Sequence, residues 1–446
     1  MRLDQTQFPA SSRRMEFNQV AALAVLVAVV GVLIHGKIRS DVAALTAAAA
    51  LLVMGVIRPV EVQGAFASPA VIALACLFVI AYAIELSGLL GLLIRQATRL
   101  CARLGAAGLW FVILLCGGAS AFLNNTPIVV LAAPVVRDVA TSLSLSPKRF
   151  LIPLSYITIM GGACTLIGTS TNLLVNDMAR NAGQPVFGLF EITPVALIIA
   201  AVGGLYLFFI GGRLLAGQSD ADSPVYGPHE QTGDGLMGDA ELFAVDRPFD
   251  VRKAVVSLII FIGVIVAAAL GIAPIAAAAF AGAIILILLR VISPEEAYAG
   301  LRPEVLLLIA GMVVVGLAIE VTGLAASGTD LLIDFIRPFG PWVALAILYG
   351  VTLFATELLS NAAVAVLITP VAVALAESFG VDPRPFLIAV MMAASAAFAT
   401  PFGYQTNVLV FQLGKYKYMD FVRVGVPLNL VTWIAGVVAI PMFFPF

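Results

Sequence analysis

A set of short motifs occurs twice in the 446-residue chain, in the same order and about 235 residues apart. Chance rarely produces several landmarks that keep one order and one spacing. The pairs are residues 83–89 (AIELSGL) with 318–324 (AIEVTGL), 125–135 with 361–371, 150–152 with 386–388, and 165–172 with 400–407. This repetition predicts two halves that share one fold.

Long apolar segments fill both halves. The chain is 61% hydrophobic and only 11% charged, whereas a soluble domain carries about 25% charged residues because its surface faces water. A transmembrane helix needs about 20 apolar residues, and the candidate spans are 18–36, 41–58, 70–92, 192–212, 253–270, 273–290, 303–323 and 422–443. We expect an all-α polytopic membrane protein whose outer surface contacts the lipid bilayer.

Four further apolar regions do not fit simple spans. Residues 108–140 and 341–377 are too long for one helix and have polar residues in the middle, so each predicts a re-entrant hairpin with arms of about a dozen residues. Residues 150–178 and 385–412 contain Gly, Pro, Thr and Asn and predict helices broken at the membrane midplane. Each half then has five transmembrane helices and one hairpin, and an odd number of spans inverts the second half relative to the first.

The domain limits follow from the one sizeable hydrophilic stretch. Residues 215–250 divide the chain nearly in half and predict a cytoplasmic linker between a first repeat, 1–214, and a second repeat, 251–446. An N-terminus on the outside places most Lys and Arg in the cytoplasm, as the positive-inside rule requires. In this orientation Arg95, Arg99 and Arg103 predict an amphipathic helix in the cytoplasmic interface of the inner (plasma) membrane.

Several function classes conflict with the composition. The net charge of −2 provides no basic stripe for nucleic acid. The four cysteines and two histidines have spacings that suit neither a disulfide framework nor a zinc site. No HExxH motif or pair of intramembrane aspartates is present in the sequence, so we expect neither an enzyme nor a cofactor.

The polar residues of the hairpins and broken helices suit ion binding. Unwound helices free carbonyl oxygens for a cation and expose N–H groups for an anion. No Lys or Arg lies in the polar motifs 120–127, 161–172, 356–362 and 399–407, so neutral groups would hold the anion and a bound cation would supply the positive charge. The alternative is that these small polar residues only allow close helix packing. The substrate-binding candidates are Asn124, Asn125, Thr126, Thr171, Asn172, Ser360, Asn361, Thr406 and Asn407.

Three acidic residues lie within the apolar regions. Glu85 and Glu320 occupy equivalent positions near span ends, where we expect them to anchor helices. Glu357 lies near the second hairpin tip, where the first half has Ala121. It either binds a proton or cation, or pairs with a structural partner, and the sequence leaves both alternatives open.

The motifs at 120–127 (SAFLNNTP), 161–172, 356–362, 399–407 and 424–430 resemble the divalent anion:sodium symporter family of the ion transporter superfamily. The resemblance runs through nearly the whole chain and implies a homodimer with two sodium sites and an oxyanion between the hairpin tips. It assigns one sodium to Ser120, Asn125 and Gly168, and the other to Thr356, Asn361 and Gly403. Ala362 stands where the family pattern has a hydroxyl, which favours the sulfate-permease-like branch over a dicarboxylate transporter.

The sequence therefore predicts a secondary active transporter that works by alternating access. Its expected activity is Na⁺-coupled symport of a small inorganic or organic dianion, sulfate or a C4-dicarboxylate, with Na⁺ as the coupling ion. The alternative is a cation/proton antiporter or metalloid exporter of the same superfamily that uses Glu357 as its proton-linked group.

Overall fold

The computed structural model describes residues 10–35, 38–89, 91–93, 96, 104–215, 249–324 and 339–446. Every regular element in these ranges is helical, so the prediction of an all-α protein is confirmed. The amphipathic helix expected around Arg95, Arg99 and Arg103 lies outside the described residues, as does nearly all of the 215–250 linker.

The helices of the two halves correspond one to one along the chain. The first half contains α1 (Ala10–His35), α2 (Ser40–Val53), α3 (Pro59–Phe66), α4 (Pro69–Leu86), α6 (Ala106–Ser120), α7 (Asn125–Ser142), α8 (Lys148–Gly162), α9 (Ser170–Asn181) and α10 (Thr193–Tyr206), which continues through η1 (Leu207–Gly211) and α11 (Gly212–Leu214). The second half contains α13 (Val251–Ala269), α14 (Ile275–Leu288), α15 (Pro294–Gly300), α16 (Pro303–Val321), α18 (Gly340–Ala355), α19 (Asn361–Phe379), α20 (Arg384–Ala394), α21 (Gln405–Leu413) and α22 (Tyr418–Phe443).

Six described helical segments are long and apolar enough to cross a membrane. They are Pro59–Leu86, Thr193–Gly211, Val251–Ala269, Pro303–Val321, Asn361–Phe379 and Tyr418–Phe443. The presence of Asn361–Phe379 was not expected, because it is one arm of the second predicted hairpin. Its 19 residues span about 28 Å, so this arm is longer than the sequence suggested.

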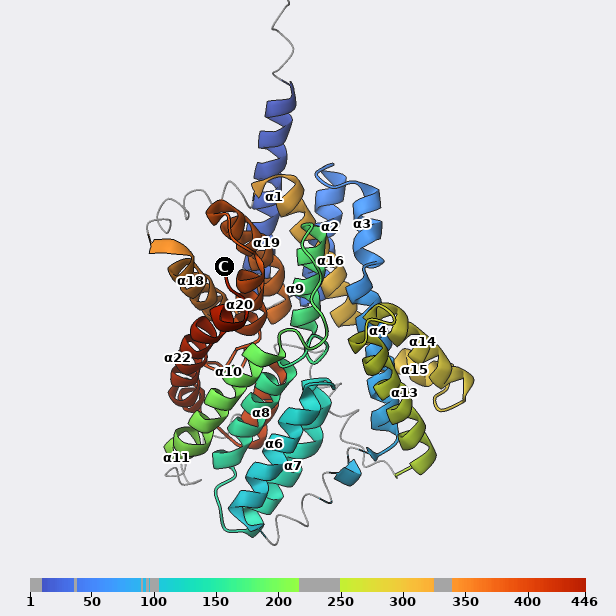
Figure 1. Ribbon diagram of the computed structural model, residues 1–446, viewed down its shortest axis with the longest axis vertical. Helices are drawn as coiled ribbons and strands as arrows, with labels where there is room; N and C mark the ends of the chain where they lie inside the picture. The colour runs from blue at the N-terminus through green and yellow to red at the C-terminus, as the bar shows by residue number, and fades with distance from the viewer. Residues whose placement is uncertain are drawn as a thin grey trace, which may run out of the picture.

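The helices pack as a pair of related halves. α4 packs against α14, and the equivalent pair α16 and α2 also pack together. In the same way α9 contacts α19 and α21 contacts α7, while α10 packs against its own counterpart, α22. In Figure 1, α6 and α7 lie at the bottom of the molecule, whereas α18 and α19 lie in its upper part. Exchanging the halves therefore preserves these helix contacts.

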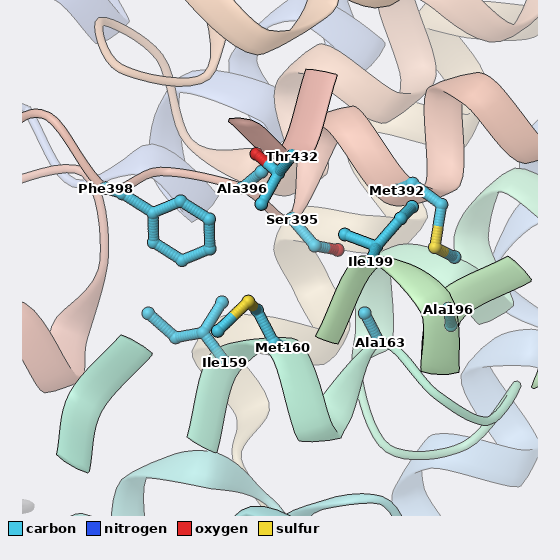
Figure 2. A pocket seen from close by; sticks show the side chains of 10 residues that line it. All are labelled: Ile159, Met160, Ala163, Ala196, Ile199, Met392, Ser395, Ala396, Phe398 and Thr432. Atoms are coloured by element: carbon cyan, nitrogen blue, oxygen red, sulfur yellow. The ribbon is translucent and has the colours of Figure 1, made fainter. Parts of the chain in front are cut away.

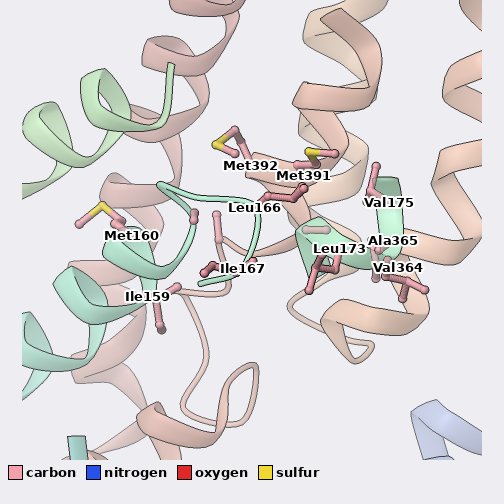
Figure 3. Packing of buried hydrophobic residues seen from close by; sticks show 14 of the residues in the cluster. Ile159, Met160, Leu166, Ile167, Leu173, Val175, Val364, Ala365, Met391 and Met392 are labelled. Atoms are coloured by element: carbon pink, nitrogen blue, oxygen red, sulfur yellow. The ribbon is translucent and has the colours of Figure 1, made fainter. Parts of the chain in front are cut away.

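Apolar side chains hold the discontinuous helices in the interior. Figure 3 shows Leu166 and Ile167 of the first break near Leu173 of α9 and Met391 of α20. All four side chains are buried. The polar backbone of the break thus lies inside protein, where irregular backbone is tolerated at membrane depth.

Close backbone contact holds α6 against α8 near the first tip. A Cβ on Gly161 would lie 2.1 Å from the carbonyl oxygen of Gly117, so only glycine fits there. At the other end of the fold, Arg384 of α20 forms an ion pair with Glu191, just before α10. These contacts join the hairpins and breaks to their neighbours and set the position of the polar tips.

Candidate functional site

The first tip joins α6 to α7 and places two asparagines at a helix N-terminus. The Asn124 side chain accepts a hydrogen bond from the Thr126 N–H (3.2 Å), which caps α7. Asn125 is the first residue of α7, and its Oδ1 accepts a hydrogen bond from the Ser120 hydroxyl. Because Asn125 is almost fully buried, its amide needs partners on both atoms, and it finds the second one across the molecule.

That partner belongs to the second broken helix. The Asn125 amide donates to the Tyr404 hydroxyl (2.7 Å), and the Thr126 hydroxyl donates to the Gln405 side-chain oxygen (3.0 Å). The Tyr404 hydroxyl also lies close to the side chain of Thr169, the N-cap of α9. The N-termini of α7, α9 and α21 consequently meet around one hydroxyl group. Helix N-termini favour negative charge, so this meeting point suits an anion.

Carbonyl oxygens converge beside the first tip. A Cβ on Gly168 would lie 2.3 Å from the Gly162 oxygen, 2.8 Å from the Ala121 oxygen and 2.9 Å from the Ser120 oxygen. A Cβ on Gly162 would lie 2.6 Å from Asn125 Oδ1. The unwound segment thus brings a set of neutral oxygen atoms together, and such sets coordinate Na⁺ in broken-helix transporters.

The first break is held open by its own side chains. Asn172 of α9 donates to the carbonyl oxygens of Thr165 (2.9 Å) and Ala163 (3.3 Å). Thr165 donates to the Ala121 carbonyl of the tip and accepts from the Gly168 N–H (3.1 Å). These bonds satisfy backbone groups that the interrupted helix leaves without partners.

The second tip joins α18 to α19 in a similar way. The Ser360 side chain accepts from the Ala363 N–H (3.3 Å) and caps α19. The Thr356 hydroxyl lies 2.8 Å from Asn361 Oδ1 and 2.8 Å from the Ala394 carbonyl oxygen. Among the described residues, no group accepts a hydrogen bond from the Asn361 amide nitrogen, which is only partly buried. That amide is therefore a free donor at the site.

Glu357 joins the second tip to the second break and to α22. Its two carboxylate oxygens accept from the Ala399 N–H (2.7 Å), the Thr400 N–H (2.9 Å), the Thr400 hydroxyl (2.9 Å) and the Asn429 amide (2.8 Å). A Cβ on Gly403 would lie 3.3 Å from one carboxylate oxygen. Donors from the second break and from α22 thus hold this carboxylate in place. Of the two roles that the sequence leaves open for Glu357, these contacts favour structural pairing over binding of a proton or cation.

Four predicted substrate-binding residues are buried within the breaks. Asn407 donates to the carbonyl oxygens of Ala397 (2.8 Å) and Thr400 (3.3 Å), as Asn172 does in the first half. Ser155 of α8 lies 2.7 Å from Asn407 Oδ1 and 2.8 Å from Thr406 Oγ1. Thr171 is also buried. These four residues lie in or beside the unwound segments, and Asn172, Thr406 and Asn407 make hydrogen bonds there.

A small cavity lies between the two breaks and the neighbouring helices α8, α10, α20 and α22. Its volume of ≈ 20 Å³ is enough for about one water molecule. Figure 2 shows Ser395 and Thr432 among largely apolar neighbours, and the Ser395 hydroxyl has no hydrogen-bond partner within the described part of the chain. This cavity suits a water and is too small for a dianion. It is lined by Ile159, Met160, Ala163, Ala196, Ile199, Met392, Ser395, Ala396, Phe398 and Thr432.

Sequence reasoning missed Tyr404 and Gln405, which contact the first tip. Both belong to the repeated break motif, where the first half has Thr169 and Ser170. A comparison of the two copies for positions that differ in size would have found them. Ser155 could have been found in the same way, because its counterpart is the apolar Met391.

Apolar helices of membrane length, two polar tips and two broken helices define a multi-pass membrane protein of the transporter class. A model of the citrate transporter family matches residues 25–386, so the chain belongs to that family. The resemblance to the divalent anion:sodium symporters is confirmed by these findings and by the relatives below.

The relatives and solved structures agree with this family. An uncharacterized transporter of Synechocystis sp. is 25% identical and covers 93% of this chain and 95% of its own length. A probable sodium/sulfate cotransporter of Chlamydomonas reinhardtii is 39% identical over 107 residues, which are 22% of this chain and 12% of that protein. The YdaH transporter of Alcanivorax borkumensis has a similar fold, with a TM-score of 0.59, 14% identity, and coverage of 85% of this chain and 86% of that one.

Proposed function

We propose that this protein is a sodium-coupled symporter of a small divalent oxyanion, with sulfate as its first candidate substrate, in the inner (plasma) membrane. The observation that carries the proposal is the meeting of three helix N-termini, α7, α9 and α21, around Tyr404 and beside a group of converging carbonyl oxygens. The first feature suits an anion and the second suits Na⁺. The sodium/sulfate cotransporter among the relatives supports this pairing.

Alternating access would follow from two inverted repeats. The one-to-one helix order, the exchange of contacts between halves and the placement of equivalent helices at opposite ends of the molecule support inversion. In this arrangement the two hairpins are re-entrant and approach the anion from opposite sides of the membrane.

Sodium would bind as a co-substrate at two places of unequal chemistry. The first site, at Gly168, offers backbone carbonyls, Ser120 and Asn125 Oδ1. The second, at Gly403, lies beside the Glu357 carboxylate and would also use the neighbouring pair Thr356 and Asn361 of the second tip. The bound cations supply the positive charge that the tips lack, so the anion requires them.

The anion itself would contact the side chains of the tips. Asn124, Asn125 and Thr126 come from the first tip, and Ser360 and Asn361 from the second. Ala362 brings no hydroxyl to its side, so the donors are unequal on the two sides. A compact tetrahedral dianion such as sulfate needs fewer matched donors than a C4-dicarboxylate, whose two carboxylates call for two equivalent tips.

Uptake into proteoliposomes tests the proposal. With an inward sodium gradient, the reconstituted full-length chain should accumulate radiolabelled sulfate, and potassium in place of sodium should abolish uptake. Asn125→Ala and Asn361→Ala should each reduce uptake severely, whereas Asn181→Ala, an exposed asparagine at the end of α9, should not. Transport that survives both tip substitutions would contradict the site assignment.

A thermal-shift screen identifies the anion independently. Sulfate, succinate, citrate and phosphate are compared with and without Na⁺. A ligand at about 100 times its Kd stabilises the folded state by about 2.7 kcal/mol. The true substrate should raise the melting temperature only when Na⁺ is present. Proton flux without any anion would instead support an antiporter.

A further inference from the structure

Two acceptors from the second break bind the donors of the first tip. The Tyr404 hydroxyl accepts a hydrogen bond from the Asn125 amide (2.7 Å), and the Gln405 side-chain oxygen accepts one from the Thr126 hydroxyl (3.0 Å). These are two of the donors that, under the proposed function, would bind the oxygens of the anion. The break of one half thus places oxygen atoms where the tip of the other half would otherwise hold substrate.

The second half lacks this arrangement. The residues equivalent to Tyr404 and Gln405 are Thr169 and Ser170, which are shorter. The tip residue equivalent to Thr126 is Ala362, which has no hydroxyl to donate. The Asn361 amide nitrogen makes no hydrogen bond to any described residue. The contacts at Tyr404 and Gln405 are therefore specific to one side of the site and do not follow from the repeat.

An unloaded carrier has a physical need for such contacts. Polar groups that leave water without partners carry a desolvation cost, and a symporter that has released its anion must return with its site empty. Asn125 is almost fully buried, so water does not satisfy its amide. The Gln405 side chain is exposed and is free to turn outward when an anion arrives.

We propose that Tyr404 and Gln405 act as an internal substitute for the anion, which satisfies the first tip in the empty carrier and allows it to reorient. This inference rests on the proposed symport, because only a carrier with a return step needs it. Tyr404 and Gln405 are then positioning residues. Their loss should slow the return of the empty carrier more than it slows movement of the loaded one.

Net uptake and exchange separate these two steps. Net uptake of radiolabelled sulfate under a sodium gradient needs the empty carrier to return, whereas exchange with sulfate and sodium on both sides does not. We expect Tyr404→Phe and Gln405→Leu each to lower net uptake by about fivefold, the effect of one ordinary hydrogen bond. Exchange should stay within about twofold of the wild type. Equal losses in both assays, or no loss in either, would overturn the proposal.

Matched controls lie elsewhere in the chain. Gln412→Leu removes an exposed glutamine from the same helix, α21. Tyr206→Phe removes a buried hydroxyl that donates to the Val424 carbonyl (3.1 Å) in the helix scaffold. Neither should change the ratio of net uptake to exchange. Gln405→Glu keeps an acceptor for Thr126 but repels an anion, so it should raise the KM for sulfate while the empty carrier still returns.

Amide hydrogen exchange of the protein without any anion separates this inference from the proposed function. Residues 121–127 should exchange about fivefold faster in Tyr404→Phe and Gln405→Leu than in the wild type and the controls. An unchanged rate of amide hydrogen exchange in this segment would contradict the proposed role of Tyr404 and Gln405. If the wild type moves no sulfate in either assay but the variants expose the segment, the proposed substrate fails while the contact at the tip stands.

Discussion

The two tips have nearly the same backbone arrangement but different surroundings. Asn125 is almost fully buried and bonded on both sides, whereas Asn361 is partly buried with a free amide nitrogen. Around the second tip, Leu358 and Phe402 are 72% and 71% exposed. The equivalent of Phe402 in the first half, Ile167, is only 8% exposed.

This difference shows how a repeated fold supports two roles. A pseudo-two-fold relation fixes where helices end and where tips lie, but it leaves side chains free to diverge. The first tip is enclosed and neutral, with carbonyl oxygens around Gly168. The second is open and carries the Glu357 carboxylate. The second tip therefore has more exposed surroundings than the first.

Added bulk at the two equivalent glycines should produce the largest effect. A Cβ on Gly168 would meet three backbone oxygens, which cannot move, whereas a Cβ on Gly403 would come nearest to the Ala397 Cβ at 2.8 Å and the Thr400 hydroxyl at 3.0 Å. Overpacking costs about 3 kcal/mol at its upper range, or roughly a hundredfold in affinity. We expect Gly168→Ala to weaken sodium-dependent uptake about a hundredfold and Gly403→Ala about tenfold.

Sodium titrations of uptake measure this difference. Gly118→Ala is the control, because a Cβ there has no atom within 4 Å. Equal effects at Gly168 and Gly403 would show that the two sodium sites are alike and would contradict the difference between the two tips.

Much of the backbone could be predicted from the sequence, because the repeat and the lengths of the apolar segments can be read from residues that are close together in the chain. The end of α8 follows from Gly161 and Gly162, because glycine is a poor helix former. α20 ends at Ala394, before an apolar stretch that carries no such signal, and Thr400 and Pro401 explain only why the chain stays non-helical up to α21. The orientation of polar side chains could not be predicted. Asn172 and Asn407 looked like ligands because they are polar residues in apolar segments, yet they bond to carbonyls of their own breaks.

Contacts between distant residues were beyond sequence reasoning for a different reason. Asn125 and Tyr404 are 279 positions apart, and only the packing of one half on the other brings them together. The Ser120–Asn125 and Thr356–Asn361 pairs were expected only through the family resemblance. Glu357 could be noticed as an asymmetry of the repeat, but its four donors could not be named.

Glu357→Gln should have the next largest effect. The amide retains one acceptor oxygen and turns an NH₂ group toward backbone N–H donors of Ala399 and Thr400. Hydrogen bonds to charged groups contribute about 1.5–3 kcal/mol, so we expect a loss of about 2 kcal/mol in stability and a lower melting temperature. Glu377→Gln, on the same hairpin but away from the tip, is the control.

The pH dependence of this variant separates the two alternatives for Glu357. A structural carboxylate predicts reduced stability with sodium-dependent uptake that keeps the pH profile of the wild type. A proton-linked group predicts normal stability and a lost pH response. Normal stability with a lost pH response would contradict the structural role and support the antiporter alternative.

Thiol labelling tests the difference in exposure directly and should give the smallest effect. The native Cys76, Cys116 and Cys164 are buried, and all four cysteines of the chain are first replaced. A water-soluble maleimide should modify Leu358→Cys and Phe402→Cys about tenfold faster than Ile167→Cys, because only accessible thiolates react. A charged maleimide also shows whether a thiol faces water or lipid, because a thiol that faces lipid is not modified.

Fast labelling at the second tip that slows when sodium and sulfate are added would place the aqueous opening there. Equal rates at Ile167→Cys and Phe402→Cys would mean that the carrier samples both openings when empty, and that the asymmetry of the tips lies in their bonding alone.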